Sequence, residues 1–409
     1  MDQLIAREEP VDFTPSRASG EKRLAAFKGR MGRHYAGERN HDLGPSDRSN
    51  VSALSPWVRS RQLLEEELVR AALDRFALST AEKFVQEVCW RTYFKGWLEH
   101  RPTVWDDYRR GLNYRFDAVA SNSGLAKAYE EAIEGRTGIE GFDDWARELV
   151  ETGYLHNHAR MWFASIWIFT LRLPWELGAD FFLKHLMDGD AASNTCSWRW
   201  VAGLHTPGKT YLARRSNIAK YTGGRFSPAG LASEAPAIDG ANPSPGMLIG
   251  GEPIPEGDIA LLLTEEDLHV ETLCPPGAKV KALAGVTFPD ARSTGGAGDV
   301  AKAFVEGAMD DSLARGSERF GLDARKSASE DLLEWARSVE CKTIVTGFPP
   351  VGWVRPHLDA LRASLAEEGI RLLYAQRDWD RAFWPHARKG FFGLKKQIPS
   401  VLAGLGFAV

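Results

Sequence analysis

The sequence has few cysteines, and their positions exclude the common cysteine-based frameworks. Its 409 residues include only four, which are scattered without a CxxC pair: Cys89, Cys196, Cys274 and Cys341. This spacing speaks against zinc sites, iron–sulfur sites and disulfide networks. We therefore expect no metal, and the sparse use of cysteine fits a reducing compartment, the cytoplasm.

The sequence also lacks a hydrophobic run that could cross a membrane. Its most apolar stretch, MWFASIWIFTL (161–171), is too short to span a bilayer and is followed by Arg172. Its first residues, MDQLIAREEPVDF, are polar and acidic, whereas a signal peptide starts basic and continues apolar. A formal net charge of -4 argues against a generally polyanion-coating protein, although a local basic face can still bind nucleic acid. We expect no membrane partner.

Tryptophan, by contrast, is abundant. The chain has 14 tryptophans and 9 tyrosines, and the excess lies mainly in the first half. Tryptophan suits positions where a large flat surface must be held rigidly. The length and a hydrophobic content of 44% allow two domains.

The spacing of apolar residues divides the chain into two parts. Over 17–221 apolar residues recur at steps of three and four, which predicts helix after helix. The segment 224–258 is dense in proline, glycine and alanine, which predicts a linker or an extended wrap. Over 259–409 the short apolar runs DIALLLT, VKALAGV, CKTIVTG and IRLLYAQ alternate with helical patterns, which predicts a mainly parallel sheet covered by helices. We place the domains at 1–223 and 259–409.

The stretch DGDAASNTCSWRW (188–200) gathers acid, amide and indole groups within a short span. Asp-Gly favours a turn, so Asp188 and Asp190 could simply cap one. If they lie near an arginine such as Arg160, they would be paired and ionised. Such carboxylates can hydrogen-bond to the imide N–H groups of a heteroaromatic ring.

Two helical segments place polar and aromatic residues on one face, in the triplets Glu87, Trp90 and Arg91, and Asn157, Arg160 and Met161. For the first triplet alone, a buried tryptophan beside a surface ion pair is a sufficient explanation. Polar groups that converge inside an aromatic helical domain need hydrogen-bond partners, however, and a bound ligand supplies them. The two faces together favour a large polar cofactor.

The segment NVSALSPW (50–57) has the features of a helix start. Ser52 and Ser55 fit an N-cap, with a proline just inside the helix. Free amides and hydroxyls at a helix N-terminus also bind phosphate groups. Both interpretations hold at once.

Two longer segments resemble the flavin-binding helical domain of the photolyase/cryptochrome family. They are TGIEGFDDWARELVETGYLHNHARM (137–161) and LPWELGADFFLKHLMDGDAASNTCSWRWVAG (173–203), and the resemblance extends over roughly 20–221. It implies FAD as cofactor, with the antenna chromophore unknown. The cofactor-binding residues it implies are Tyr35, Ser52, Leu54, Ser55, Arg91, Asn157, Arg160, Asp188, Asp190 and Asn194.

The resemblance also implies individual roles for these residues. The turn with Ser52 and Ser55 would contact the phosphates, although Val51 stands where the family has threonine. Asp188 would pair with Arg160 beside the flavin, Asp190 would bond to the pyrimidine edge of its ring, and Asn194 would face its N5 atom. Tyr154 replaces a usual tryptophan.

The family's enzymes that repair cyclobutane dimers line their substrate pocket with a glutamate, two tryptophans, an asparagine and a methionine. This chain has all five, as Glu87, Trp90, Asn157, Met161 and Trp200. Enzymes for the (6–4) lesion carry histidines in place of the asparagine and the methionine, so the resemblance favours the cyclobutane dimer. Trp198 and Trp175 match the proximal and middle members of the electron-transfer chain, with Trp97 or Trp105 as candidates for the outer member.

A basic cluster follows the second segment and predicts a contact with damaged DNA. The residues proposed for this contact are His158, Lys209, Arg214 and Arg215. A solvated loop is the alternative explanation for this cluster. The resemblance therefore predicts a monomeric, light-driven DNA repair enzyme, a deoxyribodipyrimidine photo-lyase. The alternatives are a cryptochrome-like blue-light photoreceptor without repair activity, and a flavoprotein whose photochemistry has no cellular use.

The order of the two parts differs from that of the family, which begins with its α/β domain. The fold class predicted here is mainly α plus α/β, with an all-helical FAD-binding domain followed by a Rossmann-like parallel-sheet α/β domain. This order predicts a circular permutation. The motif STGGAGDVAKAF (293–304) also resembles the anion hole of ribokinase-type sugar kinases. That fold needs a long preceding sheet domain, which the short interval after the linker cannot supply.

Overall fold

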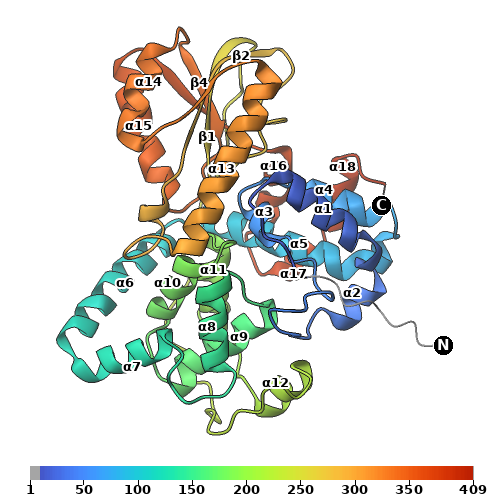
Figure 1. Ribbon diagram of the computed structural model, residues 1–409, viewed down its shortest axis with the longest axis vertical. Coiled ribbons are helices and arrows are strands. Elements are labelled where there is room, and N and C mark those ends of the chain that lie inside the picture. The colour runs from blue at the N-terminus through green and yellow to red at the C-terminus, as the bar shows by residue number, and fades with distance from the viewer. Residues whose placement is uncertain (1–9, 409) are drawn as a thin grey trace.

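The computed structural model describes residues 10–408. Residues 1–9, where the N-terminal stretch without a signal-peptide pattern begins, and Val409 lie outside this range. The chain is helical up to residue 221, and Figure 1 shows these helices below a sheet. The helices are α1 (Arg17–Phe27), η1 (Lys28–Arg30), α2 (Arg33–Glu38), α3 (Ser55–Arg59), α4 (Glu65–Leu73), α5 (Leu78–Glu99), α6 (Thr103–Ser121), α7 (Ser123–Ile133), α8 (Phe142–Thr152), α9 (Asn157–Ser165), the π-helix η2 (Ile166–Thr170), α10 (Trp175–His185), α11 (Ala191–Val201) and α12 (Arg215–Tyr221).

The ends of these helices follow from local sequence. The Asp190 side chain accepts a hydrogen bond from the Ser193 amide and caps α11, as short acidic residues do at N-caps. Gly153 ends α8 in the left-handed conformation, with φ of 65°. Both caps therefore set where the helices that carry the candidate residues begin and end.

The second part contains a five-stranded sheet with the strand order β3-β2-β1-β4-β5, and all of its neighbouring strands are parallel. Its elements are β1 (Gly257–Thr264), β2 (Ala278–Val286), η3 (Pro289–Ala291), α13 (Asp299–Phe320), β3 (Ala324–Lys326), η4 (Ser329–Asp331), α14 (Leu332–Ser338), β4 (Thr343–Gly347), α15 (Val354–Glu367) and β5 (Arg371–Ala375). The sequence predicted the other four strands but missed β3, which has only three residues. The predicted fold class, helical followed by parallel-sheet α/β, is confirmed.

Helices cover both faces of the sheet. Successive strand residues point to opposite faces, so Leu261 packs in one core with Met309 of α13, and Leu262 belongs to another core with Trp335 and Leu358 of α14 and α15. Figure 1 shows α13 on the opposite side of the sheet from α14 and α15. Because both faces are buried, the strands read as continuous apolar runs.

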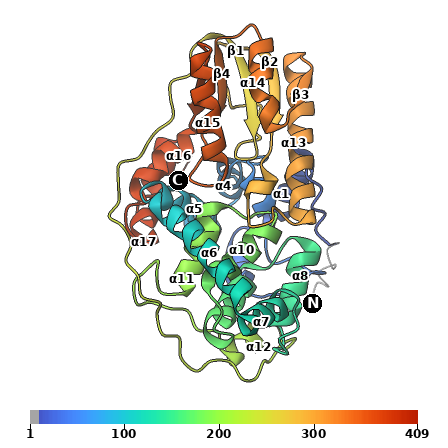
Figure 2. The same ribbon diagram turned by 90° about the vertical axis from the view of Figure 1, so that its left-hand side faces the viewer.

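The segment between the two parts is extended and follows the outside of the molecule from α12 to β1, as Figure 2 shows. Its backbone is held at several points. The Ile238 amide donates to the Ala202 carbonyl at 3.0 Å, and the Gly246 amide donates to the His100 carbonyl at 2.7 Å. The proline-rich composition therefore gives a wrap that is hydrogen-bonded to the surface.

The last elements leave the sheet and join the helical part, where the first three of them pack on α5 (Figure 1). They are α16 (Asp378–Phe383), η5 (Trp384–His386), α17 (Phe391–Lys395) and α18 (Ile398–Gly404). Trp379 donates its indole N–H to Thr92 of α5 at 2.9 Å. A β-carbon on Gly96 would lie 2.8 Å from the Trp384 ring, so this approach requires glycine.

The turn after β1 inserts three acidic residues into the helical part. Glu265, Glu266 and Asp267 are buried. The ion pairs there are Arg59–Glu266 at 2.8 Å, Arg61–Asp267 at 3.5 Å and Arg377–Asp267 at 2.7 Å. Pairing of this kind is what allows charged groups to be buried.

Within residues 10–408, no helix is long and apolar enough to cross a membrane. The same range contains no cluster of histidine, cysteine, aspartate and glutamate side chains with the arrangement of a metal site.

Candidate functional site

The stretch 188–190 lies at the meeting point of α3, α5, α9 and α11 and is held by arginines from several segments. Arg59 of α3 donates to the Gly189 carbonyl at 3.0 Å. Arg292 approaches from the α/β part, so that a β-carbon on Gly189 would lie 2.4 Å from its guanidinium. Glycine is therefore needed between the two aspartates.

Asp190 forms a buried ion pair with Arg91 of α5. Burial raises the pKa of Asp190, but the charges of Arg91 and Lys95 outweigh burial and hold the pKa below its ordinary value. The carboxylate is therefore ionised. Each of its oxygens already accepts one hydrogen bond, from Arg91 and from the Ser193 amide, and each can accept another.

Asp188 pairs with Arg160 of α9 at 2.9 Å. Burial raises the pKa of Asp188, but Arg160 and Arg91 outweigh burial and lower it. The Ser55 hydroxyl also helps to lower the pKa of Asp188, but the other carboxylate oxygen, Oδ1, is buried and has no partner with full hydrogen-bond geometry in the part of the chain that the structure describes. A buried acceptor without a donor is costly in a finished core, so this atom fits a site that a polar ligand completes.

Two more residues of α11 add to this fit. The Asn194 amide donates to the Ala179 carbonyl at 2.7 Å, which fixes the orientation of its side chain. Trp198 is 2% exposed, and its indole N–H is buried without a partner among residues 10–408. Its ring packs edge-on against Phe182 at 5.1 Å and Trp167 at 6.1 Å. The donors and acceptors present therefore suit a large polar aromatic group such as FAD.

The turn before α3 has an unusual backbone. Ala53, between Ser52 and Leu54, has φ of 52°, which is uncommon for a residue with a side chain. Arg23 donates to the carbonyl of Ser52 at 2.8 Å and so brings a positive charge to the turn. Tyr35 is buried between the rings of Phe27 and Phe84.

The five residues predicted to line a lesion pocket lie on three helices, with Glu87 and Trp90 on α5, Asn157 and Met161 on α9, and Trp200 on α11. All five retain some solvent exposure. Glu87 lies 3.5 Å from Arg39. Burial raises the pKa of Glu87, and Arg39 opposes this rise only in part. The ring of Trp200 stacks on that of Tyr211 at 5.6 Å.

Trp90 has a partner that the sequence did not reveal. The ring of Phe391, from α17, stacks on Trp90 with a centroid distance of 3.8 Å and an interplanar angle of 13°. The segment before α17 is held in place because the Tyr93 hydroxyl donates to the Lys389 carbonyl and Arg101 donates to the Arg388 carbonyl. One face of Trp90 is therefore covered by the C-terminal elements.

The basic residues predicted to contact DNA are split between two environments. Lys209, Arg214 and Arg215 are exposed. His158 instead stacks on Trp162 at 4.2 Å, and one of its ring nitrogens lies 3.3 Å from the Tyr211 hydroxyl. Tyr211 thus connects His158 on α9 with Trp200 on α11.

The predicted electron-transfer residues lie on neighbouring helices. Trp175 begins α10, and its ring lies 5.6 Å from that of Tyr108 on α6. Tyr108 in turn lies 5.3 Å from Trp105, one of the candidates for the outer member. Trp97, the other candidate, packs against His205 at 4.5 Å.

His205 leads to a prediction for stability against pH. It is buried, its Nε2 lies 2.9 Å from the Tyr93 hydroxyl, and its Nδ1 has no partner among the described residues. Burial, reinforced by Arg199 and Arg101, lowers the pKa of His205 from 6.5 to about 3. Below pH 6.5 the unfolded chain binds a proton here that the folded protein does not bind. This histidine therefore makes the folded state lose stability as pH falls, by about 1.4 kcal/mol per pH unit.

We expect His205→Gln to make the free energy of unfolding less steeply dependent on pH between pH 6.5 and about pH 5, because unfolding of the variant takes up about one proton fewer. Urea unfolding at a series of pH values measures the slope. Above pH 7 the curves of the variant and the unmodified protein should run parallel, which serves as the internal control. Equal slopes below pH 6.5 would contradict the prediction.

Comparison with known proteins finds similarity over the segment that carries most of this site. Residues 84–230 match the family model described as the FAD binding domain of DNA photolyase. A deoxyribodipyrimidine photo-lyase of Streptomyces griseus is 37% identical over 157 residues, which are 38% of this chain and 33% of that protein. One from Thermus thermophilus is 32% identical over 232 residues, which are 55% of this chain and 52% of that protein.

Among solved structures, a bacterial class III photolyase from Agrobacterium tumefaciens matches 51% of this chain and 43% of its own, with 25% identity and a TM-score of 0.42. The chain spans between a third and about half of the length of the two curated relatives. The matched model contains Arg91, Asp188 and Asp190, but it begins after the turn with Ser52 and ends before the sheet.

Proposed function

We propose, on the premise that residues 84–230 match the model of the FAD binding domain of DNA photolyase, that the protein is a light-driven DNA repair flavoprotein that splits cyclobutane pyrimidine dimers. The observation that carries the proposal is the pair of buried aspartates at 188 and 190. An ion pair with an arginine keeps each carboxylate ionised, and the Oδ1 atom of Asp188 is free to accept a hydrogen bond from a ligand.

The cofactor of the proposal is FAD, because the matched family is a FAD-binding domain. When it is bound, reduced and excited by blue light, FAD supplies the electron that opens the dimer. Asp188 and Asp190 would accept hydrogen bonds from it, and Arg91 and Arg160 would keep both carboxylates ionised. The amide of Asn194, fixed through Ala179, would tune its redox state. Tyr35, Ser52, Leu54 and Ser55 would hold its phosphate end.

The substrate of the proposal is a dimer flipped out of the DNA helix, since the reacting atoms are unreachable inside the base stack. Trp90 and Trp200 would stack on the flipped bases, and Asn157 and Met161 would complete the wall. A raised pKa favours the protonated form of Glu87, which can donate a hydrogen bond to a base carbonyl. Such a bond stabilises the negative charge that develops on the dimer.

Damaged DNA would be held by the exposed Lys209, Arg214 and Arg215 and by His158, whose ring contacts Tyr211 of the same basic segment. Exposed basic residues supply the sequence-independent part of DNA affinity, and this part weakens with salt. A monomer in the cytoplasm is the form that we propose. We also propose that the helical domain at 1–223, the linker at 224–258 and the α/β domain at 259–409 are a circular permutation of the family's order.

The experiment that tests the function uses the purified, FAD-loaded and reduced protein with an oligonucleotide that carries one cyclobutane dimer. Blue light should restore the intact bases, as followed by chromatography. We expect Glu87→Gln to lower the repair rate at least about tenfold, whereas Glu130→Gln, an exposed glutamate on α7, should leave it unchanged. If the dimers persist under blue light while light-driven flavin reduction is normal, the result would favour the cryptochrome-like photoreceptor instead.

Phe391 leads to a prediction about access to the lesion site. Its ring covers one face of Trp90, so a flipped base could stack on that face only by displacing it, and an aromatic stack is worth about 0.5–1.5 kcal/mol. We therefore expect Phe391→Ala to tighten binding of dimer-containing single strands about 2- to 10-fold. Fluorescence anisotropy with damaged and undamaged oligonucleotides measures the change.

The neighbouring residue provides the control for this variant. Phe392 is 76% exposed and makes no ring stack among the described residues, so Phe392→Ala should bind as the unmodified protein does. An equal change in both variants, or a loss of affinity in Phe391→Ala alone, would show that Phe391 does not compete with a base.

A further inference from the structure

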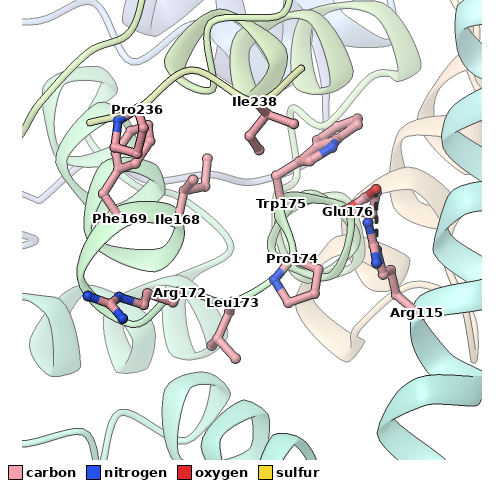
Figure 3. A pocket seen from close by; sticks show the side chains of 10 residues that line it. All are labelled: Arg115, Ile168, Phe169, Arg172, Leu173, Pro174, Trp175, Glu176, Pro236 and Ile238. Carbon is pink, nitrogen blue, oxygen red and sulfur yellow. Dashed lines mark ion pairs between the residues drawn. The ribbon is translucent and has the colours of Figure 1, made fainter. Parts of the chain in front are cut away.

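A cavity of about 330 Å³ opens beside Trp175, at the start of α10 (Figure 3). Its walls are apolar and come from two segments that are distant in sequence, with the residues Ile168, Phe169, Leu173, Pro174, Pro236 and Ile238. Figure 3 shows Pro236 and Ile238 of the extended wrap facing the turn that precedes α10. The lining includes the ring side chains of Phe169, Pro174, Trp175 and Pro236, and rings of this kind suit contact with a planar aromatic molecule.

Two backbone irregularities form one wall of this cavity. The π-helix η2 ends at Thr170, and Arg172 follows with φ of 57°. Both features are rare in proteins as a whole, but they are enriched at functional sites. The turn is fixed because the Leu173 amide donates to the Trp167 carbonyl at 3.0 Å. As a result, Arg172 is held at the rim.

The charged residues of the cavity indicate what it can bind. Arg172 is exposed and makes no ion pair with any described residue. Arg115 pairs with Glu176 at 3.5 Å. Glu176 is 8% exposed, and its Oε2 atom is buried without a hydrogen-bond partner among residues 10–408. A ligand with an acidic group for Arg172 and a hydroxyl donor for Glu176 would satisfy both.

Trp175 connects this cavity to the interior. Gly178 lies three residues further along α10, on the same face of the helix, and a β-carbon there would lie 2.3 Å from the Trp198 ring. Trp198 therefore packs directly on the helix that Trp175 begins. A molecule in the cavity would therefore touch Trp175 itself, on the same helix against which Trp198 packs.

We propose that the cavity binds a planar hydroxylated aromatic acid that reduces the oxidised Trp175 by one electron. This proposal rests on the proposed function. After Trp175 has lost an electron inward to Trp198, with the oxidised flavin as the final acceptor, the bound phenol gives one electron to the Trp175 radical cation. The O–H bond of the phenol breaks, and its proton passes to the Glu176 carboxylate. The products are neutral Trp175, protonated Glu176 and a phenoxyl radical that leaves.

The first test measures binding in the dark by calorimetry, with FAD-loaded protein and 3,4-dihydroxybenzoate. We expect one molecule to bind per chain and Arg172→Asn to weaken binding at least about tenfold. Asparagine tolerates the left-handed backbone of this position, so the turn should survive. Arg110→Gln, on the same helix as Arg115 but outside the cavity, should bind normally. Equal binding to Arg172→Asn, or no binding to the unmodified protein, would overturn the proposal.

The second test separates this proposal from the proposed function. Under blue light, the rate of flavin reduction should saturate with dihydroxybenzoate concentration in the unmodified protein but rise linearly in Arg172→Asn. Glu176→Gln should bind the donor yet reduce the flavin more slowly. If dithiothreitol supports light-driven reduction and dihydroxybenzoate does not, the docking site is wrong and the proposed function stands. If neither donor supports it, the assignment of Trp175 and Trp198 to electron transfer fails as well, and the repair assay with chemically reduced protein decides the proposed function separately.

Discussion

Replacing Arg61 with methionine should lower the free energy of unfolding by about 3–5 kcal/mol. Arg61 is 2% exposed, and its guanidinium pairs with three carboxylates from different parts of the chain. The pairs are with Asp380 of α16 at 2.5 Å, Asp267 after β1 at 3.5 Å and Glu65 of α4 at 3.7 Å. Methionine would leave these carboxylates buried without their shared cation.

The size of this effect follows from burial rather than from the number of ion pairs. Burial alone lowers the pKa of Arg61, but the three carboxylates outweigh it and raise the pKa. Burial also raises the pKa of Asp380, and Arg61 opposes that rise. Without Arg61, Asp380 would have to take up a proton or remain as an uncompensated buried charge, and either change costs stability.

An exposed pair supplies the control. Arg337 and Glu368 lie 2.5 Å apart on the surface, where solvent screens the pair, so Arg337→Met should leave the free energy of unfolding nearly unchanged. Urea unfolding followed by circular dichroism compares the two variants with the unmodified protein. A loss below about 1 kcal/mol for Arg61→Met would contradict the view that this arginine joins the two halves of the chain.

The repeating patterns of the sequence are sufficient for most of the architecture. Apolar steps of three and four predict the helices up to residue 221, and continuous apolar runs such as DIALLLT predict strands that are buried on both faces. Strand β3 was not predicted because its three residues, Ala324 to Lys326, are partly exposed and too few to form a pattern. Periodicity therefore predicts long, buried elements and misses short edge strands.

Periodicity does not reveal which elements meet. Nothing in the spacing of residues 378–395 shows that they leave the sheet and pack on α5. The stack of Phe391 on Trp90 and the bond from Trp379 to Thr92 arise from side-chain complementarity across about 300 residues of chain. Such contacts depend on the folded geometry and have no local sequence signal.

The candidate site likewise contains some residues that the sequence reveals and others that it does not. Its two aspartates and Arg160 stand out in the sequence because they lie in a dense local motif. Arg59 and Arg292, which also hold this stretch, come from a short helix and from a loop of the other part. Arginine is frequent on surfaces, so a lone arginine in a sequence gives no sign that it will be buried.

Glycine 178 leads to the second large prediction, because it sets the position of Trp198. In most helix interiors, replacing glycine with alanine stabilises the protein by about 0.5–1 kcal/mol. Here the new β-carbon would lie 2.3 Å from the Trp198 ring and 2.9 Å from the Trp167 ring. Both rings are fully buried and cannot turn away. We therefore expect Gly178→Ala to destabilise the protein by about 1–3 kcal/mol.

Gly111→Ala is the matched control, since Gly111 lies inside α6 and its nearest neighbour would be the Glu176 carboxylate at 3.4 Å, an ordinary contact. This variant should be as stable as the unmodified protein or more so. Thermal unfolding compares the two. Because Trp198 must move in Gly178→Ala, light-driven flavin reduction should slow in that variant and remain normal in Gly111→Ala. If Gly178→Ala kept both its stability and its rate, the close packing of Trp198 on the helix that begins with Trp175 would not control electron transfer.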